Sequence, residues 1–202
     1  MPSLTVNAGS GSGRLFSAAN TWANTRAGTG VIQGVDGQAK VLSEKQTPGG
    51  SGEIHEIDRC FFNFDTSSLP DNAIIGTVQL KLFVNAITRN GMGTYGFYIV
   101  SSLQANPASL AFTDWNNVGS SDLGGGRKDE TSTGLKTYTV DSSLVSSTGY
   151  TKIALRPNRD ITNVPPEDDN DREEWRFDAY NGSTPPQLVV NYTVPGMFLA
   201  FL

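Results

Sequence analysis

Short segments in which apolar and polar residues alternate strictly are the feature that most constrains the fold. The clearest of them covers residues 74–85 (IIGTVQLKLFVN) and places four apolar side chains on one side: Val78, Leu80, Leu82 and Val84. A two-residue period is that of a β-strand with one buried and one exposed face. We therefore expect residues 74–85 to form a half-buried strand.

Residues 54–64 (IHEIDRCFFNF) differ because apolar groups occur on both sides of the predicted strand. Cys60, Phe62 and Phe64 share one face, while Phe61 lies on the other face between Arg59 and Asn63. This pattern indicates a central strand. It also predicts that Cys60 is a buried and unreactive thiol, since a reactive cysteine needs an open, electropositive setting.

Turn residues divide the rest of the chain into further short strands. With 22 Gly, 10 Pro and 17% charged residues, the composition is typical of a β-domain rich in turns. Asp36–Gly37 predicts a tight hairpin between two strands. Residues 8–30 are predicted to form loops anchored by Phe16 and Trp22. No long helix is expected. The other expected strands are 1–7, 31–35, 39–43, 94–103, 135–140, 151–156, 175–180 and 187–194. About ten strands at this spacing predict a single all-β domain over residues 1–194, a jelly-roll-like antiparallel β-sandwich.

Charge and hydropathy exclude several classes of function. The net charge is −5 without a cluster of Lys and Arg, which argues against nucleic acid as a partner. No apolar stretch has the length of a membrane span. Residues 1–7 lack the basic and apolar regions of a signal peptide. The single cysteine excludes an internal disulfide, so assembly in a reducing cytoplasm is compatible with the sequence.

Several motifs resemble the DNRLRE domain family. They are 59–70 (RCFFNFDTSSLP), 73–82 (AIIGTVQLKL), 113–115 (TDW), 153–156 (IALR) with Asp160, and 185–192 (PPQLVVNY). The resemblance covers roughly residues 4–194. It implies a jelly-roll β-sandwich related to carbohydrate-binding modules and no catalytic residues. Such domains occur in phage structural proteins and in bacterial surface proteins.

Catalytic candidates are few, and we predict that the protein is not an enzyme. His55, the only histidine, lies between Glu53 and Glu56. Half of an acid–base pair is one interpretation, but a solvated or capping histidine at a strand start is preferred. For Arg59, with Asp65 at the other end of the same strand, we expect a structural ion pair at the sheet surface, with a ligand contact as the alternative.

Two groups of side chains are weak candidates for ligand binding. Asp168, Asp169 and Asp171 in an acidic loop have oxygen atoms that suit Ca²⁺, but they lack the spacing of an EF-hand, so a solvated loop is preferred and no cofactor is expected. Trp22, Trp115 and Trp175 could stack on the sugar rings of a surface glycan if they were exposed. Packing in the core is the alternative for each.

Residues 195–202 form an apolar C-terminal segment with five large side chains: Met197, Phe198, Leu199, Phe201 and Leu202. Burying them could supply about 8–12 kcal/mol before ordering costs. We expect this docking tail to pack on its own sandwich or on a neighbouring subunit.

Together these features predict a non-catalytic virion structural protein made in the host cytoplasm: a phage capsid decoration, head-fibre or tail-surface subunit. Its expected partners are other virion subunits or further copies of itself, with host-glycan adhesion as an additional role left open. The alternative is a carbohydrate-binding module of a cell-surface or secreted bacterial protein.

Overall fold

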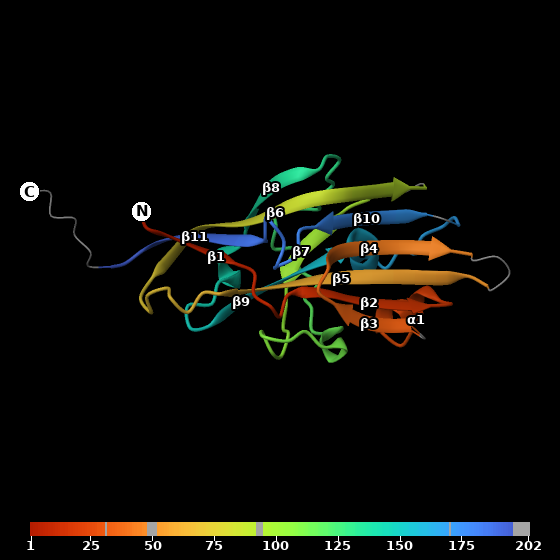
Figure 1. Cartoon of the computed structure of the whole chain (residues 1–202), viewed down its shortest axis with the longest axis horizontal. Coiled ribbons are helices and arrows are strands. Elements are labelled where there is room, and N and C mark those ends of the chain that lie inside the picture. The colour runs from red at the N-terminus through yellow and green to blue at the C-terminus, as the bar shows by residue number, and fades with distance from the viewer. Residues whose placement is uncertain (31, 48–51, 92–94, 170, 196–202) are drawn as a thin grey trace, which may run out of the picture.

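The structure is a computed structural model that describes residues 1–30, 32–47, 52–91, 95–169 and 171–195. Its regular elements are mostly antiparallel strands, so the predicted single all-β, sandwich-like domain is confirmed (Figure 1). The strands are β1 (Ser3–Asn7), β2 (Gly13–Ala19), β3 (Ile32–Asp36), β4 (Ala39–Gln46), β5 (Ile54–Asp65), β6 (Ile74–Asn90), β7 (Phe97–Ser101), β8 (Gly134–Val140), β9 (Tyr150–Pro157), β10 (Arg172–Phe177) and β11 (Gln187–Thr193). The helical elements are α1 (Trp22–Ala27), α2 (Asn158–Thr162) and the single turns η1 (Phe112–Asp114) and η2 (Ser142–Leu144).

Two long strands, β5 and β6, connect the layers of the sandwich. The first part of β5 pairs with β4, whereas Cys60–Asp65 pairs with β9. In the same way the start of β6 pairs with β11 and its end with β10. The strands form one hydrogen-bonded network. Its order is β1-β11-β6-β10-β4-β5-β2-β3, with β8 beside β6 and β7 beside β9. Because both long strands change partners part-way, this network bends around a core.

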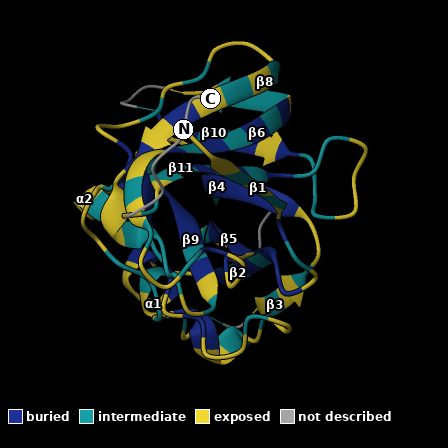
Figure 2. Cartoon of the chain, turned by 90° about the vertical axis from the view of Figure 1, so that its left-hand side faces the viewer, coloured by how far each residue is buried: buried dark blue, intermediate teal, exposed yellow. Residues whose placement is uncertain are grey.

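The two faces of β5 contact two different hydrophobic clusters, which confirms its predicted central position. Cys60, Phe62 and Phe64 lie in the larger cluster, together with the four inward residues predicted for β6. Phe61 lies in a smaller cluster with Trp115. Figure 2 shows the buried positions gathered along the strands and the exposed positions along the loops and outer margins.

Aromatic side chains fill the centre of the larger cluster. The ring of Phe97 meets those of Tyr138, Trp175 and Phe177 edge-on, with centroids 5.5–6.1 Å apart. Edge-to-face packing of this kind places the positive ring edge against a negative ring face. These contacts join β7, β8 and β10 across the core.

Two predictions about the first forty residues are wrong. Residues 8–30 contain β2 and α1, whose N-cap Thr21 accepts a hydrogen bond from the Asn24 backbone N–H. Asp36–Gly37 does not close a hairpin, since β3 pairs with β2 while β4 pairs with β5 and β10. The favoured two-residue hairpin turn needs positive φ at both central residues. Neither residue has it, so the chain continues to the other side of β5.

No helix in the described ranges is long and apolar enough to cross a bilayer.

Candidate functional site

The three tryptophans proposed as glycan-stacking residues are buried, as the core alternative had it. Trp22, Trp115 and Trp175 are 8%, 2% and 0% exposed. The Trp115 ring stacks on Phe112, and the Trp175 indole N–H donates to the Glu130 carbonyl at 3.0 Å. Their flat faces are therefore occupied by other parts of the chain.

His55 is buried rather than solvated, so the preferred sequence interpretation was wrong. It lies in β5 between β2 and β4, and the Trp22 ring packs edge-on against it. Its Nε2 is 2.9 Å from a Glu53 carboxylate oxygen, which is also 3.1 Å from Lys45 Nζ. Burial, partly offset by Glu53, lowers the pKa of His55. This arrangement holds β4 against β5.

The acidic loop is tied to the sandwich by its own side chains. Asp171 is buried and accepts a hydrogen bond from Arg159 Nη2 at 2.6 Å, and Asp169 accepts one from the Thr47 hydroxyl at 2.6 Å. The Asp168 backbone carbonyl accepts a hydrogen bond from the Asp171 N–H at 3.0 Å. Within the described part of the chain, no three His, Cys, Asp or Glu side chains converge to hold a metal ion.

The predicted docking residues Met197, Phe198, Leu199, Phe201 and Leu202 lie outside the described residues.

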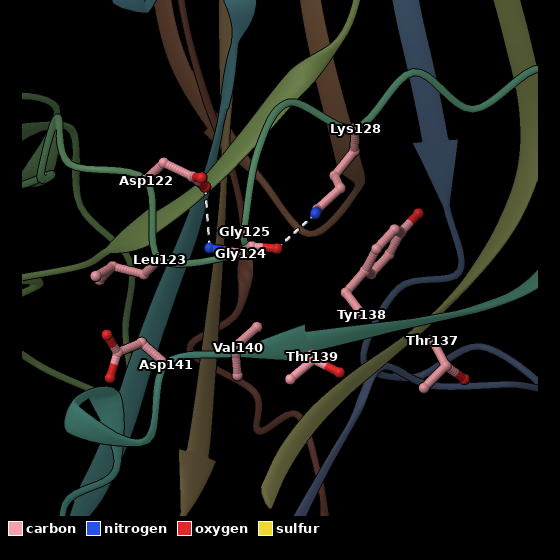
Figure 3. Close-up of a pocket in the computed structure, with 10 residues that line it drawn as sticks. All are labelled: Asp122, Leu123, Gly124, Gly125, Lys128, Thr137, Tyr138, Thr139, Val140 and Asp141. Atoms are coloured by element: carbon pink, nitrogen blue, oxygen red, sulfur yellow. Dashed lines mark hydrogen bonds between the residues drawn. The ribbon is translucent and has the colours of Figure 1, made fainter.

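An open pocket of about 600 Å³ lies between the glycine-rich loop 122–128 and strand β8 (Figure 3). Asp122, Lys128, Tyr138 and Asp141 are its ionisable lining residues. In Figure 3, Asp122 and Lys128 both point toward Gly124, Asp122 accepting its N–H at 2.9 Å and Lys128 donating to its carbonyl. Their charges thus organise the loop.

The remaining two groups do not form an acid–base pair. The Asp141 carboxylate accepts the Ser143 N–H at 2.8 Å and caps η2, and this backbone hydrogen bond lowers the pKa of Asp141. Burial raises the pKa of the Tyr138 hydroxyl, with Glu130 adding to the effect. A general acid and base need pKa values near the working pH, and neither group has one.

A cluster of buried charged side chains surrounds Asp160. Its carboxylate accepts four hydrogen bonds, two from Arg59 at 2.7 and 2.9 Å and two from Arg156 at 2.8 and 2.9 Å. Burial opposes its ionisation, but the two guanidinium groups hold the pKa of Asp160 well below its usual range. The Arg59 guanidinium also lies over the Trp115 ring, 4.0 Å from the centroid.

The surface ion pair expected for Arg59 and Asp65 is therefore wrong. They are six positions apart on an extended strand, a distance of about 20 Å, which is too far for contact. Arg59 is buried and bonds Asp160, which α2 brings to the smaller hydrophobic cluster. Asp65 is exposed and accepts hydrogen bonds from Ser67.

A second ionic group links β2, β4, β5 and β10 on the other side of the sheet. Lys40 Nζ lies 2.8 Å from Asp58 and 3.7 Å from Glu174, while Arg14 joins Asp58 to Asp36. This group could not be predicted from the sequence, because its members are far apart in the chain and meet only where their strands pair.

No protein-family model matches this chain, and no curated protein is significantly similar to it in sequence. The similarity to the DNRLRE family therefore stays a prediction, carried by the motifs named above.

Proposed function

We propose that the protein is a non-catalytic structural subunit of a virus particle, such as a phage capsid decoration, head-fibre or tail-surface subunit. The observation that carries the non-catalytic part is the use of its charged groups. The buried carboxylates of Asp58, Asp160, Asp171 and Glu174 each contact Lys or Arg side chains that join neighbouring elements. Side chains committed in this way stabilise a scaffold and are not free to activate a substrate.

Assembly through apolar contacts is supported by the apolar sequence of residues 196–202 and by an exposed apolar side chain at the end of β11. Thr193 pairs with Ile74 in the β11–β6 ladder, two residues before Pro195. Ile74 is 61% exposed, so an exposed apolar side chain lies beside the end of β11. An apolar segment that remained in water would promote aggregation. Docking on a neighbouring subunit removes it from water.

The carbohydrate-binding alternative receives less support from the same residues. Glycan-binding modules stack sugar rings on exposed aromatic faces. The three tryptophans in the described part of the chain are enclosed in the core. Recognition of a neutral sugar would need other residues.

Sedimentation velocity tests the proposal by comparing the full chain with a chain that ends at Pro195. We expect the full chain to associate as its concentration rises and the shortened chain to stay folded and monomeric. A glycan array on both proteins tests the carbohydrate-binding alternative. A full chain that is monomeric at all concentrations and binds one glycan selectively would favour the carbohydrate-binding alternative.

A further inference from the structure

A second hollow in the structure has a different chemistry from the pocket of Figure 3. It has a volume of about 350 Å³ and lies between α1, the loop after η1, the end of β9 and the residue that ends α2. Its lining residues are Ala23, Arg26, Ala27, Arg59, Asn116, Val118, Arg156 and Asn163. Three are arginines and none carries a carboxylate.

The charges around this hollow do not balance. Among the described residues, Asp160 is the one carboxylate in contact with its three guanidinium groups. Three positive charges against one negative charge leave a formal excess of two. Asp160 is fully buried beneath the arginines, so the excess charge faces the hollow.

Arg26 provides the free hydrogen-bond donors. Its Nε donates to the Asp160 backbone carbonyl at 3.0 Å, and the nearest carboxylate oxygen is 3.4 Å away. Its Nη1 and Nη2 have no acceptor among the described residues, although the side chain is only 28% exposed. The N–H groups of both nitrogens are therefore available to a ligand.

The other two arginines are held in fixed positions before any ligand arrives. Arg59 donates to the Trp115 carbonyl at 2.6 Å and Arg156 donates to the Gly119 carbonyl at 3.0 Å. The Arg26 carbonyl in turn accepts from the Trp115 indole at 3.0 Å, which holds the end of α1 against the cluster. Groups held in this way lose little conformational entropy on binding.

We propose that this hollow, the arginine pocket, binds a single oxyanion group: a carboxylate, sulfate or phosphate. The planar guanidinium fork matches the paired oxygens of these groups. Asn116 and Asn163 also line the hollow, and their amide groups can add hydrogen bonds. The inference does not depend on assembly into a particle, because every residue of the pocket belongs to one chain.

Titration of the full chain with sodium phosphate, sodium sulfate or sodium acetate tests the proposal, with sodium chloride keeping the ionic strength constant. The arginine Nε–Hε signals in a ¹⁵N NMR spectrum report binding directly. We expect the Arg26 signal to shift and saturate with at least one of the three anions, and the anion that binds most tightly identifies the group. If none shifts it more than chloride does, the arginine pocket is only a structural ion cluster and the proposal is wrong.

Two variants, at arginines of similar exposure, distinguish binding in the arginine pocket from attraction to general surface charge. Arg26→Gln should weaken binding of the preferred anion by at least about tenfold, because donors to a charged group are lost. Arg89→Gln is the control, since Arg89 is 29% exposed but pairs with Asp129 outside the pocket. Equal affinity in both variants would overturn the proposal. Arg26→Lys keeps the charge without the fork, and should bind with intermediate affinity even if Arg26→Gln does not fold.

Discussion

Replacing Asp160 by Asn removes the charge at the centre of the buried ionic cluster while keeping the shape of the side chain. The Asp160 carboxylate accepts four hydrogen bonds from Arg59 and Arg156, and it is fully buried. An amide has one acceptor oxygen, and its NH₂ group would face guanidinium donors. At least two donors would lose their acceptor, and both cations would stay buried without a counter-charge.

Breaking a buried ion pair by removing one partner costs about 3–5 kcal/mol. For a chain of this size each kcal/mol lowers the melting temperature by about 2–4 °C. Asp160→Asn should therefore lower Tm by about 6–20 °C. The exposed Asp65 gives a matched control, because its carboxylate bonds only Ser67 among the described residues, and Asp65→Asn should cost less than about 1 kcal/mol.

Urea unfolding at pH 7, followed by tryptophan fluorescence and by far-UV circular dichroism, measures both variants. The three buried tryptophans make the fluorescence signal sensitive to loss of the core. If the unfolding free energy of Asp160→Asn lies within about 1 kcal/mol of that of the unsubstituted chain, the cluster does not stabilise the fold and the reasoning is refuted.

Three further predictions concern other positions in the fold. Burial raises the pKa of Glu173 to about 7 from an ordinary 4.5, so its contribution to stability is complete below about pH 4.5 and is lost as the pH rises through 7. From pH 4.5 to pH 8, the unfolding free energy of Glu173→Gln should therefore rise by on the order of 3 kcal/mol relative to that of the unsubstituted chain, as measured by urea unfolding. The same difference in unfolding free energy at both pH values would contradict this. Cys60, whose pKa is raised by burial, should resist a thiol reagent in the folded protein and react at once in urea; rapid reaction without urea would show that β5 is accessible. Gly28→Ala should lower the unfolding free energy by more than about 1 kcal/mol, because φ is +70° and an added Cβ would lie 2.3 Å from Trp115 Cδ1; an unchanged urea midpoint would show that α1 can shift.

The parts of the fold that could be predicted are those whose local pattern and burial agree. β6 was predictable because its inward side chains alternate with polar ones, and β5 because both of its faces carry apolar groups. β2 was missed because Gly13–Ala19 is made largely of small residues, whose burial leaves little alternation to detect. The hairpin predicted at Asp36–Gly37 was wrong because a dipeptide does not reveal which strands pair with the two strands that flank it.

The charged interior was harder to predict for a related reason. Arg59 was recognised as structural, but its partner Asp160 is 101 residues away, and only the fold brings them together. Arg26 could not be recognised from the sequence, because α1 lies in a stretch whose Gly, Ser, Asn and Thr content is typical of loops. Thr21 and Gly28, the cap residues of that helix, were the local signal that could have revealed it.

The most direct test of the proposed role in assembly is photocrosslinking from position 198 in the full chain, with a photoreactive phenylalanine in place of Phe198. Mass spectrometry of the crosslinked peptides then identifies what the segment 196–202 contacts. The account predicts crosslinks to a neighbouring subunit, which disappear when the protein is diluted below its association range. Crosslinks confined to the same chain, unchanged by dilution, would contradict it.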